Sequence, residues 1–115
     1  MSTRALLVFT TIDNADAARR LADSLVAAQR VACVNILPPV TSVFRWDGAS
    51  EDAGSARVQA ETEVMLVMKT TTSAYPELEN QLRQEHPYEL PEIIAVPVDR
   101  GLPDFLHWID AVTHP

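Results

Sequence analysis

The sequence predicts an α+β domain in which an antiparallel sheet carries helices on one face. Three observations support this class: short apolar or alternating runs typical of strands, longer runs with helical periodicity, and their order, β-α-β-β-α-β-α. The 115 residues form a single predicted domain, 1–115. A chain of this length can bury a core without disulfides or metals.

The first strand and helix are predicted at residues 5–12 and after Asn14. Residues 5–12 form a nearly continuous apolar run with β-branched members, as expected of a central strand. Asp13 or Asn14 can cap the helix, and Asp16 lies where the helix dipole favours an acid. The expected buried face holds Ala15, Ala18, Leu21, Ala22, Leu25 and Val26.

A long hairpin is predicted for residues 31–71. Its first arm, 31–37, is interrupted by Pro38 and Pro39 and resumes over 40–46. Proline cannot donate to a strand ladder, so the pair marks an edge strand or a bulge. The second arm alternates from Val58 to Thr70, about twice the usual strand length, so its first half must project beyond the domain's own sheet. Residues 48–56 are expected to form a mobile loop at the tip.

A second helix, a rigid turn and a fourth strand follow the hairpin. Thr72 or Ser73 can cap the helix, and Pro87 ends it. Its expected buried face holds Tyr75, Leu78 and Leu82. Two prolines stiffen the turn, residues 86–91, and the strand is expected at 92–98. Pro97 places that strand at an edge of the sheet.

A third helix is predicted to begin with Pro103 at its first position. Its expected apolar stripe holds Phe105, Leu106, Trp108, Ile109 and Val112. His107 lies away from the centre of this stripe and is expected to face solvent. The last residues, 113–115, are expected to fray.

This order of elements predicts a ferredoxin-like βαββαβ arrangement with an extra C-terminal helix. Right-handed crossovers in a split βαβ pair place the first and third strands in the centre and the second and fourth at the edges. The long apolar edge over 31–46 would be an aggregation hazard if it stayed open. Pairing in a closed homo-oligomer is the economical way to cover it.

Composition excludes several classes of function. A net charge of −7 and nine scattered Lys and Arg argue against nucleic-acid binding. The sequence has no apolar run of ~18 residues to span a membrane, and the single Cys33 and the absence of a leader pattern predict a cytoplasmic location. We find no nucleophile with an adjacent base, no Gly-rich phosphate loop and no paired-Cys zinc spacing, so we expect no enzyme.

Several long motifs resemble those of the CutA family, the divalent-cation tolerance proteins. They are ACVNILP at 32–38, TSVFRWDG at 41–48, Lys69-Thr70, HPYELPEI at 86–93 and Trp108-Ile109, and the resemblance spans residues 5–112. It implies a ferredoxin-like homotrimer in which the hairpin 31–71 pairs between subunits. It also implies a link to tolerance of copper and other divalent metals.

The resemblance also suggests a metal site. Some members of the family are thought to bind Cu²⁺ through a cysteine and two adjacent histidines, and the matching positions here hold Thr10, Glu85 and His86. With Cys33, Glu85 and His86 form our candidate ligand set for weak binding of a divalent cation, with no obligatory cofactor. The alternatives are a helix-terminal cap for His86 and an inert buried thiol for Cys33.

A second hypothesis is a PII-like trimer that senses or signals through a small ligand held in a cleft between subunits. Its candidate residues are Arg45, Trp46, Lys69, Tyr88 and Glu92. The alternative role for the two aromatic residues is to anchor an interface. Lys69 is expected to pair with a carboxylate such as Glu61, Glu89 or Glu92, either within the chain or across an interface. A third hypothesis is an interaction scaffold that displays the loop 48–56.

Overall fold

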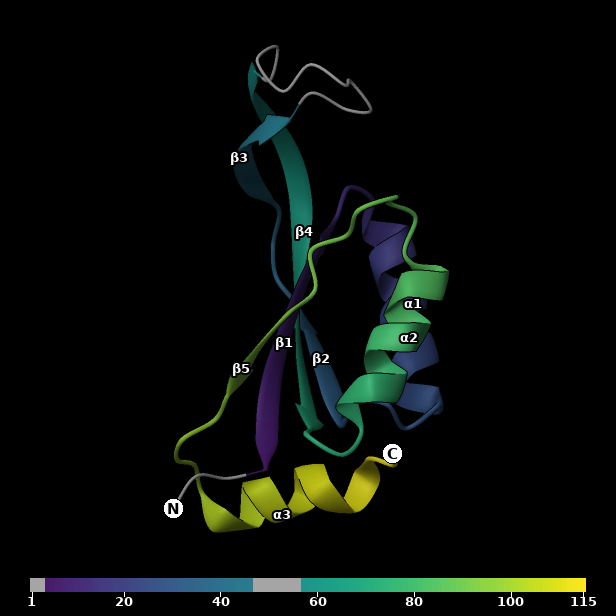
Figure 1. The fold of residues 1–115 in the computed structure, drawn as a ribbon, viewed down its shortest axis with the longest axis vertical. Coiled ribbons are helices and arrows are strands. Elements are labelled where there is room, and N and C mark those ends of the chain that lie inside the picture. Colours follow the sequence, from purple (N-terminus) through teal and green to yellow (C-terminus); the bar gives the residue numbers. More distant parts are fainter. Residues whose placement is uncertain (1–3, 47–56) are drawn as a thin grey trace.

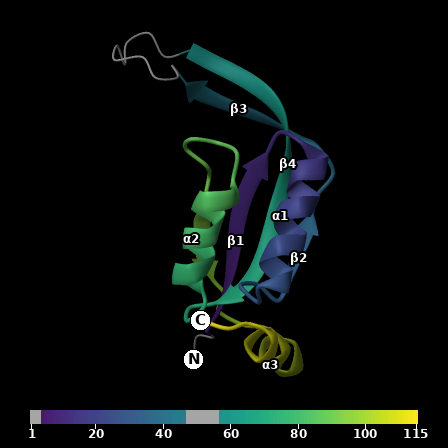
Figure 2. The same cartoon turned by 90° about the vertical axis from the view of Figure 1, so that its right-hand side faces the viewer.

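A computed structural model of the chain describes residues 4–46 and 57–115. Its elements are β1 (Ala5–Ile12), α1 (Ala15–Ala27), β2 (Cys33–Ile36), β3 (Val40–Trp46), β4 (Arg57–Thr71), α2 (Tyr75–Glu85), β5 (Ile94–Pro97) and α3 (Pro103–Val112). Helices α1 and α2 cover one face of an antiparallel sheet, and α3 lies across its lower end (Figures 1 and 2). The predicted α+β class and order of elements are confirmed.

The sheet has the strand order β2-β4-β1-β5, and β3 pairs with the outer part of β4. The first and third predicted strands, β1 and β4, are therefore central, and β2 and β5 are edges. Pro97 lies in β5 opposite Leu6, and among the strands of the described residues β5 pairs only with β1. The missing proline N–H therefore falls in an edge strand, as expected.

The main core lies between the sheet and the two helices. Four residues of α1 are buried against it, Ala18, Leu21, Ala22 and Leu25, together with Leu78 and Leu82 of α2. Ala15 and Val26 were expected in the same face, but both are exposed. Val26 faces an open groove between α1 and the edge strand β2.

A one-residue bulge bends the long hairpin at Pro38 and Pro39. Ile36 pairs with Leu66 and Val40 with Glu63, so three residues on one arm (37–39) face two on the other (64–65). The bulge bends the strand, and the hairpin beyond it leans away from the rest of the sheet (Figure 2). The predicted bulge and projection are both confirmed.

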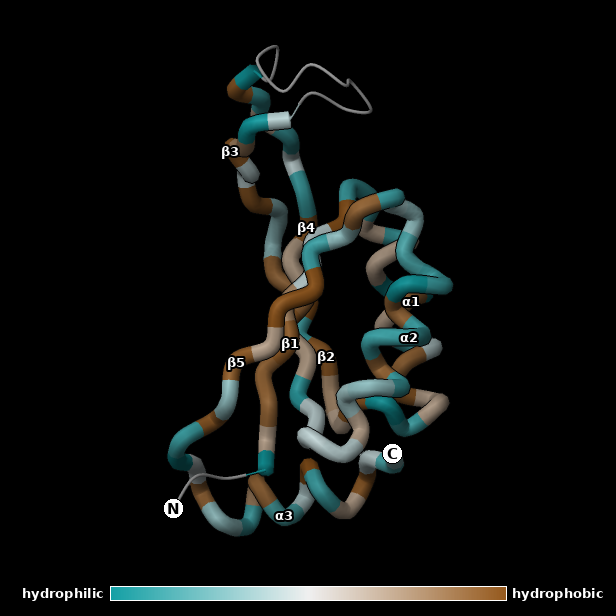
Figure 3. Tube along the Cα trace, in the orientation of Figure 1, coloured by the Kyte–Doolittle hydropathy of each residue, from teal (hydrophilic) through white to brown (hydrophobic). Residues whose placement is uncertain are grey.

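The projecting hairpin leaves apolar residues uncovered in this chain. Apolar segments continue along β3 and β5 outside the region that the helices cover (Figure 3). Val43 is 67% exposed and Val58 is 71% exposed. The radius of gyration is 15.6 Å, against about 13 Å for a compact domain of this length.

The buried contact of α3 is smaller than its apolar stripe. Ile109 packs with Ala5 and Ala32 in a second small cluster. Phe105 and Trp108 belong to the predicted apolar stripe, but both are exposed, and their rings meet at a tilt with centroids 5.5 Å apart. They lie on the side of the helix that this single chain leaves open.

Several local expectations are wrong. Neither Thr72 nor Ser73 caps α2; the Thr71 hydroxyl accepts the Ala74 N–H at 3.2 Å, because strand β4 continues to Thr71. The two edge strands of the sheet are shorter than predicted, since β2 spans Cys33–Ile36 and β5 spans Ile94–Pro97. The loop 48–56 lies outside the described residues.

The C-terminal residues are anchored rather than frayed. The Thr113 hydroxyl donates to the carbonyl of Ile109 at 2.9 Å, and the His114 N–H donates to the carbonyl of Gln29 at 2.8 Å. Gln29 has a φ of 60°, a left-handed conformation just past the end of α1. The end of the first helix therefore supplies a backbone acceptor for the last residues of the chain.

Candidate functional site

A buried histidine fixes the turn that follows α2. His86 is 6% exposed, and its Nε2 lies 2.9 Å from the carbonyl oxygen of Thr11, at the end of β1. The Tyr88 N–H donates to His86 Nδ1 at 3.1 Å. Because a donor occupies Nδ1, the proton of the neutral imidazole belongs on Nε2, where it donates to Thr11. Both ring nitrogens therefore hold the backbone of the turn.

The same turn places the Tyr88 side chain over the start of the sheet. The rings of His86 and Tyr88 meet edge to face, with centroids 4.7 Å apart. The Tyr88 hydroxyl donates to Glu63 Oε2 at 2.7 Å. A continuous set of contacts thus runs from β1 through the turn to β4.

The surroundings of Tyr88 are strongly negative. Burial contributes most to raising its pKa far above the ordinary tyrosine value, and the hydrogen bond and negative charge of Glu63 add to it, followed by Asp13 and Glu61. The negative charges of Glu61 and Glu63 on β4 and of Asp13 after β1 therefore all disfavour ionisation of the Tyr88 phenol. The un-ionised phenol is the form that can donate to Glu63.

We expect Tyr88→Phe to lower the free energy of unfolding by about 1–3 kcal/mol, because the buried Glu63 loses its donor. The folded-state pKa of Tyr88 lies above its unfolded value near 10.0, so the associated stability is complete below that pH and is lost as the pH rises through the folded pKa. The phenylalanine variant should lose less stability above that pH. Urea unfolding near neutral pH and above the ordinary tyrosine pKa measures both effects; equal alkaline losses in the two proteins would contradict the assignment.

A groove of about 840 Å³ opens between the β3–β4 hairpin and the turn after α2. Three of the predicted cleft residues line it: Trp46, Tyr88 and Glu92. Trp46 comes from β3, Tyr88 from the turn, and Glu92 from the short segment between the turn and β5. The structure thus brings together residues separated by more than forty positions in the sequence.

Sequence reasoning missed the buried carboxylate of this groove. Glu63 is 7% exposed and lies beside Asp13 and Phe44 in the lining. The period-two alternation of β4 places Glu63 on the solvent-facing side of the strand. That pattern cannot show that the turn after α2 folds over this side. The negative charge just before an apolar run was the available signal.

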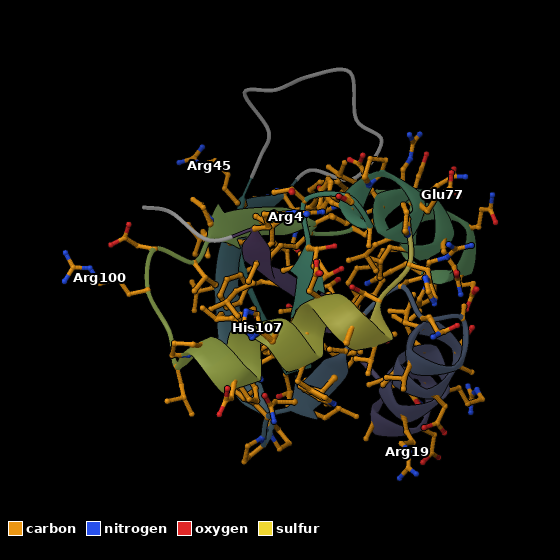
Figure 4. All side chains as sticks on the ribbon, turned by 90° about the horizontal axis from the view of Figure 1, so that it is seen from below. Arg4, Arg19, Arg45, Glu77, Arg100 and His107 are labelled. Atoms are coloured by element: carbon orange, nitrogen blue, oxygen red, sulfur yellow. The ribbon has the colours of Figure 1, made fainter. Side chains whose placement is uncertain are left out.

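Two predicted cleft residues lie elsewhere. Arg45 is exposed and points away from the body of the chain (Figure 4), since its neighbours Phe44 and Trp46 take the groove side of β3. Lys69 lies near the far end of β4, opposite Cys33 and Leu7. Within the chain, the Lys69 ammonium group donates to the Asn35 amide oxygen and forms no ion pair within residues 4–46 and 57–115. An ion pair of Lys69 across a subunit interface stays a prediction.

The candidate metal ligands do not converge in the single chain. Glu85 is exposed at the end of α2, His86 is buried beside it, and Cys33 pairs with Lys69 across the sheet. In the part of the chain that the structure describes, no group of three or more His, Cys, Asp or Glu side chains is arranged to hold a metal ion. The Thr10 hydroxyl, at the remaining matched position, is buried without a hydrogen-bond partner among these residues.

The split βαβ topology with both long helices on one face defines a ferredoxin-like α+β protein. Comparison identifies its group more closely: residues 6–112 match the model for the CutA1 divalent ion tolerance protein. The chain belongs to this family.

Two relatives show the extent of the match. The divalent-cation tolerance protein CutA of Thermus thermophilus is 38% identical over 103 residues, which cover 90% of this chain and 92% of that protein. The crystal structure of CutA1 from Shewanella sp. SIB1 superposes with a TM-score of 0.87 at 36% identity and is covered completely, as is this chain.

A longer relative matches equally well. The mouse protein CutA is 37% identical over 105 residues, which cover 91% of this chain but 55% of that protein. The chain thus spans about half the length of the mouse relative. None of the described helices is long and apolar enough to cross a membrane.

Proposed function

We propose that the chain acts in tolerance of divalent cations as a cytoplasmic homotrimer without catalytic activity. Membership of the divalent ion tolerance family supports this role. The observation that supports assembly is the exposed apolar surface of the projecting hairpin, where Val43 and Val58 lie uncovered in the single chain. One relative is named chloroplastic and another periplasmic, so cell fractionation is the test of the cytoplasmic location.

Direct metal binding belongs to the same proposal and has a specific test. Calorimetric titration of the metal-free protein with copper(II) should give saturable heat that is lost in Glu85→Gln and His86→Ala. His107→Ala should retain the signal, because His107 is an exposed imidazole on α3 that does not belong to the candidate ligand set. Coordination requires the neutral imidazole, so binding should weaken as the pH falls.

Two results would count against metal binding at the end of α2. One is the absence of saturable copper binding to the wild type. The other is equal binding by wild type and both variants. Glu85→Gln is the cleaner variant, because Glu85 is exposed, whereas His86→Ala also removes both contacts that hold the turn. Zinc(II) serves as the second metal.

The groove supports a second candidate function, the sensing of a small ligand. Its volume of about 840 Å³ falls within the range of ligand sites. Trp46, Tyr88 and Glu92 supply aromatic and polar contacts from two separate segments. Ligand binding there should shift the melting temperature of the wild type, and Trp46→Ala should remove the shift.

A further inference from the structure

We draw no further inference here: the strongest candidate, the exposed apolar side of α3 with Leu102, Phe105 and Trp108, carries no proposal, because nothing among the described residues shows what covers it.

Discussion

The double substitution Val43→Asp/Val58→Asp is expected to convert the assembled protein into folded monomers. The two valines are diagonal neighbours on one face of the hairpin, and both are more than half exposed in the single chain. If a partner subunit covers them, each carboxylate would be buried without a counter-charge, and a closed trimer repeats that cost at every interface. Native mass spectrometry at micromolar protein measures the outcome.

The same variant should keep the subunit fold. Substitutions at exposed positions normally change the free energy of unfolding by less than about 0.5 kcal/mol within a subunit, so the circular dichroism spectrum should remain that of an α+β domain. Val43→Thr/Val58→Thr is the matched control, since threonine keeps the β-branched shape without a charge. A trimer that survives the aspartate pair, or a wild-type chain that is monomeric, would contradict this assignment of the interface.

The sequence predicted the fold well where local patterns and topology agree. The bounds of β1 and β3 follow from apolar runs that end at polar or turn residues, and Pro103 marks the start of α3. Pro38 and Pro39 predicted an edge strand or a bulge, because proline cannot donate to a ladder, and the structure has both. These features depend on residues close together in the chain.

The errors arose where a distant segment decides the outcome. The period of α3 marks Phe105 and Trp108 as apolar, but it cannot show that this chain covers only the Ile109 side. Similarly, the backbone N–H of His114 donates to the carbonyl of Gln29, which has a left-handed conformation. No local sequence motif predicted that conformation. Neither feature follows from periodicity alone.

The candidate site shows the same limit. Tyr88 and Glu92 were chosen from a rigid turn, and Trp46 from a strand, and the groove unites them. Arg45 and Lys69 were chosen by residue type. Strand alternation turns Arg45 to the face of β3 that does not line the groove. Lys69 lies outside the groove, six positions beyond Glu63 along β4. Which strand residues face a groove depends on register, and the bulge shifts that register by one residue.

The largest loss of subunit stability is expected from Leu66→Ala. Leu66 is fully buried on β4, where it pairs with Thr10 of β1 and Ile36 of β2 and joins the core beneath α1 and α2. Removing its branched end leaves a cavity between the sheet and both helices, at a cost of about 2–5 kcal/mol. Urea unfolding at a fixed protein concentration measures the change, because assembly makes stability depend on concentration.

Leu102→Ala makes the same chemical change at an exposed position just before α3, and should cost less than about 0.5 kcal/mol. The comparison also tests whether the core and the hairpin depend on each other. One part of β4 pairs with β1 in the core, and the other part pairs with β3 in the projecting hairpin. A loss confined to the subunit core should lower the midpoint of unfolding while native mass spectrometry still detects the assembled form. Equal losses for the two leucine variants would show that the core does not depend on β4 as the structure indicates.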